Sequence, residues 1–224
     1  MRVSPLEGHA IWASHYDTEP NPLLALETRT LCRFMEPIPL RRFVDVACGT
    51  GRWMSYLHAR GGDVLGSDAC EPMLKVADNK RGLRGKCVVA DATLLPFPRR
   101  FADVTLCSFA AGYVPDLARL VYQLAAVTRY GGRVIVTDLH PAAITAGWTR
   151  SFRVGTIVYE IEHVVHSEEQ LFAAGKCAGL RLETHLQASF GEPERVLFER
   201  AGKGELFDQV SATPAVWIGV WRTP

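Results

Sequence analysis

The spacing of apolar positions divides the chain into strand-like and helix-like segments. Apolar residues recur at helical spacing over 23–35, and that pattern ends before "EPIPL", where two prolines prevent a helix from continuing. Further on, buried-type strands alternate with helices. The expected strands are 43–47, 63–67, 86–90, 102–108 and 133–138, and the expected helices are 51–60, 71–79 and 117–129, the last ended by the "YGG" turn. Such alternation implies βαβ units and a parallel sheet covered on both faces.

After residue 138 the alternation stops. Residues 139–156 form a loop-like insertion, and the β-branched, alternating "IVYEIEHVVH" that follows predicts a strand. The "SEEQ" at 167–170 is a capping-box pattern that opens a helix to about residue 178. Two late strands, "LRLETHLQASF" and "AVWIGVW", flank a helical stretch over 196–210. We therefore expect an α/β fold: a Rossmann-like, doubly wound sheet of seven strands, mostly parallel and closed by an antiparallel C-terminal hairpin.

Composition limits the classes of function. The 224 residues suit one domain, and the formal net charge of +1 without blocks of like charge does not indicate binding to nucleic acid or an anionic membrane. The six cysteines are scattered without a C-x-x-C pair, which is typical of reduced thiols. There is no apolar leader-like segment and no 18-residue apolar span, so the sequence predicts a cytoplasmic protein that does not span a membrane. Oligomeric state cannot be inferred from these features.

A glycine turn follows the first buried strand in "FVDVACGTGRWMSYL", residues 43–57. The G-T-G at 49–51 begins a dinucleotide-type G-x-G-x-x-G pattern, but Met54 stands where the third glycine belongs. Asp45 lies in the preceding strand, where a carboxylate would repel phosphates and suit a ligand with an ammonium group. A plain strand–helix turn remains the alternative.

Two more acids stand at the ends of the next strands. Asp68 ends the second strand, where an acid can accept hydrogen bonds from ribose hydroxyls, and Asp91 with Ala92 follows the third strand, in position to meet an adenine edge. Asp68 could instead only cap the following helix, and Asp91 could only cap a short loop. Acids at three successive strand ends predict a site for a cationic adenosine ligand at the carboxyl edge of the sheet.

These stretches resemble a known family. "VDVACGTG", "GSDACEPML", "VVADATLLPF", "FADVTLCSFA" and "GGRVIVTDLHP" are similar to successive motifs of the class I S-adenosylmethionine-dependent methyltransferases, especially the small, single-domain ubiquinone/menaquinone-biosynthesis type. The resemblance covers residues 40 to 140 well. It departs from the family's pattern after the fourth strand, where "SFAAGYV" stands in place of the acid or Asn followed by E-H that is often found there.

The resemblance implies S-adenosyl-L-methionine as the cofactor and a role for each matching position. Asp45 and the glycines of the turn would line its methionine part, Asp68 its ribose and Asp91 its adenine. The full set of implied cofactor-binding residues is Asp45, Gly49, Gly51, Asp68, Ala69, Met73, Asp91, Ala92, Ser108, Phe109 and, from the N-terminal "SHYD", Tyr16. Residues 1–30 match the family only loosely. We expect one domain over 1–224, with an N-terminal lid at 1–30, a cofactor-binding core at 40–138, a substrate-cap insertion at 139–166 and a C-terminal sheet closure at 167–224.

The catalytic residues are less determined by the sequence. Methyl transfer relies on alignment, and a base is needed only where the acceptor atom carries a proton to lose. His140 follows the fifth strand and is the first candidate, His163 lies in the inserted strand with His166 on its opposite face, and Tyr16 is the third candidate. His9 and His15 lie in the N-terminal segment that would fold over the site. No metal site is predicted, because no further ligand joins the histidines at ligand spacing.

The predicted function is methyl transfer to a small-molecule acceptor, with the acceptor atom (O, N, C or S) left open. The aromatic residues of 1–30 and 139–166 suit a small, planar or hydrophobic acceptor. A non-catalytic S-adenosylmethionine-binding regulator or partner subunit, and more remotely an NAD-dependent oxidoreductase, are the alternatives.

Overall fold

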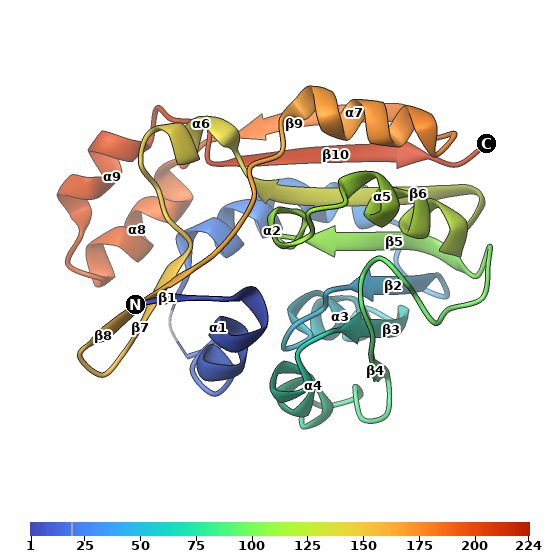
Figure 1. Cartoon of the computed structure of the whole chain (residues 1–224), viewed down its shortest axis with the longest axis horizontal. Helices are drawn as coiled ribbons and strands as arrows, with labels where there is room; N and C mark the ends of the chain where they lie inside the picture. Colours follow the sequence, from blue (N-terminus) through green and yellow to red (C-terminus); the bar gives the residue numbers. More distant parts are fainter. Residues whose placement is uncertain (19) are drawn as a thin grey trace.

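A central sheet of seven strands organises the protein. The computed structural model describes residues 1–18 and 20–224, and its main sheet has the order β4-β3-β2-β5-β6-β10-β9 (Figure 1). The strands are β2 (Arg42–Val46), β3 (Asp63–Asp68), β4 (Cys87–Val89), β5 (Ala102–Ser108), β6 (Thr128–Leu139), β9 (Arg181–Ala188) and β10 (Val216–Arg222). The first five in chain order pair in parallel, and β10 runs antiparallel to both β6 and β9. This confirms the expected doubly wound sheet with an antiparallel C-terminal hairpin.

Helices cover both faces of this sheet and enclose a hydrophobic core on each. The helices are α2 (Pro22–Met35), α3 (Arg52–His58), α4 (Glu71–Asp78), α5 (Leu117–Val127), α7 (Glu168–Cys177), α8 (Glu192–Arg200) and α9 (Gly204–Val210), with a short 3-10 turn η1 (Ala111–Tyr113). Buried residues of α2, α3, α8 and α9 pack together with one sheet face, and those of α5 and α7 pack with the other. None of the helices described is both long enough and apolar enough to cross a membrane.

Four boundaries differ from the sequence prediction. The helix at 117–129 ends at Val127, and the "YGG" stretch lies inside β6 because Gly131 and Gly132 bond to the end of the chain through Pro224 and Thr223. The insertion contains a helix, α6 (Pro141–Thr145), and a strand, β7 (Ser151–Val154). The strand expected over 157–166 is shorter, β8 (Ile157–Ile161), and the helical stretch over 196–210 is the end of α8 followed by α9.

A second, small sheet joins the two segments that were expected to cover the site, residues 1–30 and 139–166. It has the order β1-β8-β7, where β1 (Arg2–Val3) pairs in parallel with β8 through Arg2↔Glu160 and Val3↔Ile161. Helix α1 (Pro5–Trp12) follows β1, and Figure 1 shows it beyond the end of the β5 arrow, at the carboxyl edge of the main sheet. We call β1, α1, β7 and β8 the cap.

Candidate functional site

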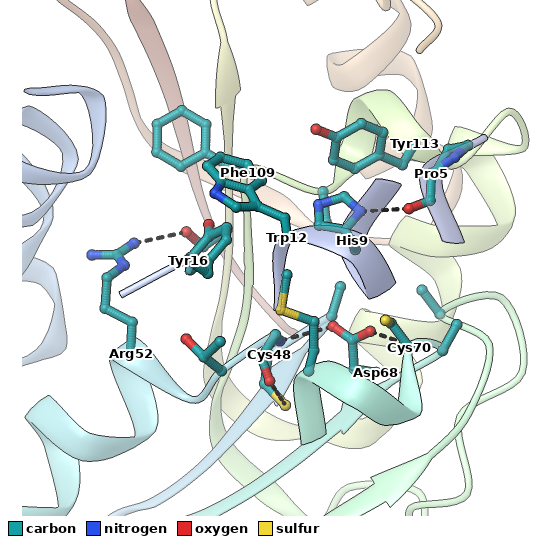
Figure 2. A pocket seen from close by; sticks show the side chains of 18 of the residues that line it. Pro5, His9, Trp12, Tyr16, Cys48, Arg52, Asp68, Cys70, Phe109 and Tyr113 are labelled. Atoms are coloured by element: carbon teal, nitrogen blue, oxygen red, sulfur yellow. Dashed lines mark hydrogen bonds between the residues drawn. The ribbon is translucent and has the colours of Figure 1, made fainter. Parts of the chain in front are cut away.

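A cavity of about 330 Å³ lies between the carboxyl ends of the parallel strands and the cap (Figure 2). Ten of the eleven positions expected to bind a cofactor line it: Tyr16, Asp45, Gly49, Asp68, Ala69, Met73, Asp91, Ala92, Ser108 and Phe109. The cap contributes Pro5, Leu6, His9 and Trp12 to its wall. The topology therefore gathers residues that are dispersed over a hundred positions of the sequence into one space.

Glycine is required at positions 49 and 51 of the turn for two different structural reasons. Gly49 has φ +55°, and a Cβ built there would meet no atom within 4 Å, so the cavity is open above it. Gly51, the one expected position that does not line the cavity, has φ +75°, and its Cβ would come within 2.8 Å of Leu83. Gly49 thus leaves room for a ligand, whereas Gly51 allows α3 to pack closely against the neighbouring segment.

Left-handed backbone also occurs at two non-glycine residues of the cavity. Ala47, just after β2, has φ +56°, and Phe109, just after β5, has φ +53°. Side chains of L-residues disfavour this region, and such strained positions cluster at functional sites. Their presence at two strand ends supports a functional role for this edge of the sheet.

Asp45 is a buried carboxylate without a full set of partners. Its side chain lies in the cavity wall, the residue is 3% exposed, and Oδ1 has no hydrogen-bond partner among the described residues. Burial raises the pKa of Asp45 well above its usual value, and the Arg52 guanidinium opposes this shift. A buried acceptor of this kind is stabilised when a cationic donor enters the cavity.

Asp68 organises the turn from the end of β3. Its Oδ2 accepts from the Gly49 backbone N–H and its Oδ1 from the Cys70 N–H, each at 2.8 Å. The bond to Cys70 is the helix-cap role that the sequence left open, and the bond to Gly49 adds a second role. Burial raises the pKa of Asp68, while the two backbone N–H groups lower it. Each oxygen retains a lone pair for a ligand hydroxyl.

Asp91 lines the cavity two residues beyond the end of β4. Its Oδ1 accepts from the backbone N–H and the hydroxyl of Thr93, both at 2.7 Å. These bonds lower the pKa of Asp91, so the group is ionised near neutral pH. Asp91 therefore caps the loop, as the sequence left open, and also lines the cavity.

A buried polar network that sequence reasoning missed supports the floor. Glu27 of α2 is fully buried and accepts hydrogen bonds from the Trp53 indole at 3.1 Å and the Ser108 hydroxyl at 2.6 Å. It also bonds to the Arg52 guanidinium and to the Thr137 hydroxyl. The signal in the sequence was a lone acid inside the apolar pattern of 23–35, whose partners lie 25 to 110 positions away.

Aromatic rings make the wall that the cap contributes. Trp12 stacks on Phe152 of β7 with centroids 4.7 Å apart and an interplanar angle of 4°, and Tyr16 meets Trp12 edge-on at 4.6 Å. His9 meets Tyr113 of η1 edge-on at 4.9 Å. Burial raises the pKa of Tyr16 to about 12, so its hydroxyl stays protonated and can donate a hydrogen bond.

The structure does not bring two of the three predicted catalytic residues to this cavity. His140 accepts the Ala142 N–H as the N-cap of α6, and its Nε2 lies 3.0 Å from Glu168. His163 follows β8, with Nδ1 3.2 Å from the Ile161 carbonyl, and lines a separate small cavity. The expectation that His163 and His166 alternate along one strand is wrong, because β8 ends before both. Tyr16 alone of the three lines the main cavity.

Comparison with known proteins finds a matching domain model and related sequences over about half of the chain. A family model described as "Methyltransferase domain" matches residues 44–136. The demethylmenaquinone methyltransferase of Thermus thermophilus is 35% identical over 106 residues, which cover 45% of this chain and 48% of the relative. The nocamycin O-methyltransferase of Saccharothrix syringae is 30% identical over 138 residues, covering 58% of this chain and 49% of the relative. The chain thus spans about half the length of these relatives.

A solved structure agrees over most of the chain. An S-adenosylmethionine-dependent methyltransferase from Mesorhizobium loti superposes with a TM-score of 0.71 at 20% identity, over 90% of this chain and all of that one. The sequence matches agree with the expected resemblance, and the superposition shows the fold. Residues 44–136 match the methyltransferase-domain model, and they lie within a fold shared with this S-adenosylmethionine-dependent methyltransferase.

Proposed function

We propose that the protein binds S-adenosylmethionine in the main cavity and transfers its methyl group to a small-molecule acceptor. The observation that carries this proposal is the unpartnered Oδ1 of Asp45, a buried acceptor in the wall of a cavity that is open above Gly49. A phosphate-bearing dinucleotide would place negative charge near that carboxylate, whereas a ligand with an ammonium group would supply the missing donor. The relatives named above are methyltransferases, which supports the same reading.

Each polar residue of the floor then has a role. Asp45 would accept from the ammonium group, Asp68 from the ribose hydroxyls, and Asp91 with Ala92 would face the adenine. Bound S-adenosylmethionine would supply a methyl carbon activated by the adjoining sulfonium. The chain's task is to align the acceptor with that carbon and exclude water, since alignment contributes most of the rate in such a displacement.

The acceptor is proposed to be small and flat. A cavity of about 330 Å³ lies at the lower end of the usual range for ligand sites, which leaves little room beside a cofactor while the cap is in place. The cap wall offers the aromatic faces of Trp12 and Tyr113. The names of the two relatives refer to a quinone-type compound and to nocamycin, both consistent with a small-molecule acceptor.

Ligand-dependent unfolding tests the cofactor assignment. S-adenosylhomocysteine at 100 times its dissociation constant should add about 2.7 kcal/mol to the free energy of unfolding, and NADH should add nothing. Gly49→Val places a branched side chain in the open space above the turn and should abolish the effect of S-adenosylhomocysteine while the protein still folds. Stabilisation by NADH alone, or unchanged binding by Gly49→Val, would contradict the proposal.

A panel of acceptors tests the reaction. The wild-type protein is incubated with S-adenosylmethionine and phenols, hydroquinones, carboxylic acids, thiols or amines, and formation of S-adenosylhomocysteine is followed. We expect turnover with at least one class. Tight cofactor binding without any turnover would favour a non-catalytic binding protein.

A further inference from the structure

One imidazole lines the main cavity among the residues that the structure describes, and it belongs to His9 of α1. Its Nδ1 lies 2.7 Å from the Pro5 carbonyl oxygen, one helical turn earlier. A carbonyl can only accept a hydrogen bond, so Nδ1 must carry the proton in the neutral ring. Nε2 therefore bears the free lone pair, which makes it a hydrogen-bond acceptor and a base.

The surroundings of His9 hold its ring in the wall of the ligand space. Figure 2 shows the imidazole above Asp68, between Trp12 and Tyr113, with the nitrogen that does not bond Pro5 on the side of Trp12. The ring meets the edge or face of Tyr113 at 83°, which fixes its plane. The position lies on the cap side of the cavity, opposite the floor where Asp45 and Asp68 would hold the cofactor.

Burial keeps His9 neutral near physiological pH, against the hydrogen bond to the Pro5 carbonyl, which raises its pKa. Asp68 from β3 and Arg150 from the segment before β7 act on it with opposite signs, and Tyr113 from η1 is a protonated phenol, since burial raises the pKa of its hydroxyl. Burial is the largest effect and lowers the pKa of His9. A neutral imidazole at pH 7 is ready to accept a proton.

The other titratable groups in the cavity wall are less suited to this task. Asp45 and Asp68 belong to the floor, and Asp91 is held by Thr93 at the rim. A hydrogen bond with Cys87, together with burial, raises the pKa of the Cys48 thiol. Burial raises the pKa of the Cys70 thiol and of the Tyr16 phenol, so these three groups stay protonated. Their neutral forms can donate hydrogen bonds but accept a proton poorly.

We propose that Nε2 of His9 is the general base for an acceptor that carries an aromatic or enolic hydroxyl. This inference rests on the proposed function and adds the acceptor atom, oxygen, and the residue that activates it. His9 takes the hydroxyl proton as the acceptor oxygen bonds to the methyl carbon, and the electron pair of the broken carbon–sulfur bond stays on sulfur. The products are a methyl ether, neutral S-adenosylhomocysteine and an imidazolium, which returns its proton to solvent. The stacked rings of the cap wall suit a flat acceptor, and a flat hydroxyl compound is acidic enough to be activated by an imidazole.

Nuclear magnetic resonance of ¹⁵N-labelled histidine tests the premise without turnover. Assigning His9 by comparison with His9→Gln, we expect the tautomer protonated at Nδ1 and a titration midpoint below the ordinary value of 6.5. An imidazole that is protonated at Nε2 in its neutral form would overturn the proposal.

The pH dependence of turnover tests the role. With phenol, hydroquinone and enol probes, wild-type kcat should fall as pH drops through the midpoint measured for His9, because the imidazolium cannot accept a proton. His9→Gln keeps a donor for the Pro5 carbonyl but has no basic atom, so kcat should drop about 10²- to 10⁴-fold and the acidic limb should vanish. His15→Gln should keep both the rate and the limb.

The outcomes separate this inference from the proposed function. Affinity for S-adenosylhomocysteine, measured by calorimetry, should be the same in wild type and His9→Gln. If the wild-type protein does not bind S-adenosylhomocysteine, the proposed function fails. If it binds but turns over only thiols, amines or carboxylic acids, or no hydroxyl probe at all, or if His9→Gln retains the wild-type rate and pH profile, the role of His9 is overturned alone.

Discussion

The floor and the cap of the cavity are built in opposite ways. The floor comes from β2, β3 and β5, which pair directly in parallel register, as in Asp45↔Gly66 and Asp45↔Leu106, so that consecutive strand ends come to one edge. The cap joins β1, at the start of the chain, to β8, more than 150 positions later, through two pairs of residues. Short-range patterns determine the floor, whereas a long-range pairing with little sequence signal determines the cap.

The two regions also differ in what holds them. Fully buried strands and the Glu27 network stabilise the floor. The cap has a two-residue strand, a stack of Trp12 on Phe152, and partly exposed apolar residues in β8, Ile157 and Val158. Segments with few buried apolar contacts open at low free energy. We therefore expect changes in the floor to affect global stability or cofactor binding, and changes in the cap to affect local opening.

Glu27→Ala should have the largest effect. The substitution removes a fully buried carboxylate and leaves Arg52, with 25% of its side chain exposed, without its ion-pair partner beside an unpaired Trp53 indole. Breaking a buried pair from one side costs about 3–5 kcal/mol. Urea unfolding should show this loss in a single global transition.

A matched acid outside the network provides the control for Glu27. Glu71 forms an i,i+4 pair with Lys75 at 2.9 Å, and both side chains are mostly exposed. Glu71→Ala should change stability by less than about 0.5 kcal/mol. Equal losses for the two variants would show that the Glu27 network does not stabilise the floor.

Asp68→Ala should have the next largest effect, mainly on cofactor affinity. It removes the proposed ribose acceptor and the acceptor of the Gly49 and Cys70 N–H groups, and charge-assisted bonds of this kind contribute about 2–3 kcal/mol. Calorimetry with S-adenosylhomocysteine should show affinity reduced by about 30- to 150-fold. Asp68→Asn, which keeps one oxygen, should lie between the alanine variant and wild type. Unchanged affinity in both variants would refute the ribose role.

The contrast between floor and cap explains what could be predicted from sequence. Strand β5 was predicted with its observed bounds, because an apolar run between turn signals suffices to define a central parallel strand. The strand ends then place Asp45, Gly49 and Asp68 at one edge without further information. The role of Glu27 required knowledge of partners far along the chain, and a two-residue β1 leaves no periodicity to detect.

The insertion at 139–166 also shows that residue positions outside the sheet are hard to predict from sequence. His140 was chosen because it follows a strand, and His163 because it was expected within the inserted strand. In the structure His140 caps α6 and His163 lies beyond β8, and the fold of the insertion determines both positions. The distance from a strand end along the sequence predicts position well inside a βαβ unit. It predicts position poorly once the chain leaves the sheet.

We predict that a bound ligand makes local opening of the cap less favourable and that loss of the Trp12 side chain makes it more favourable. Residues 1–12 and 157–161 should be protected from hydrogen exchange to a similar degree, because β1 pairs with β8, and both should gain protection when S-adenosylhomocysteine binds. A truncation that removes residues 1–18, and with them β1 and α1 of the cap, should cripple methyl transfer and leave the main sheet folded.

Trp12→Ala removes the stack on Phe152 and should lower the free energy of local opening by about 1–2 kcal/mol. Exchange in β2 and β5 should stay as in wild type. Tyr130 is exposed and lies on β6, outside the cap. The control variant Tyr130→Ala should leave hydrogen exchange in the cap unchanged. Identical exchange with and without ligand, together with full activity of the truncated protein, would refute the lid.

Asp45→Asn should have the smallest effect on the free protein. The variant should be more stable than wild type near neutral pH but should bind the cofactor more weakly. The folded state raises the pKa of Asp45 above the unfolded value near 3.8, because ionising the buried carboxyl is unfavourable. The folded state therefore binds the proton more tightly, and wild-type stability falls as pH rises from that value toward the raised one. Asparagine cannot ionise, so the variant should match wild type below about pH 3.5 and exceed it by about 1–2 kcal/mol at pH 7.5, the typical cost of an unpaired buried polar group. Urea unfolding at both pH values checks this.

The same variant should bind S-adenosylhomocysteine more weakly at pH 7.5, since the amide cannot pair with an ammonium group as a carboxylate does. A stability difference that does not vary with pH, or affinity that is retained, would show that the free Oδ1 is not kept for a cationic ligand.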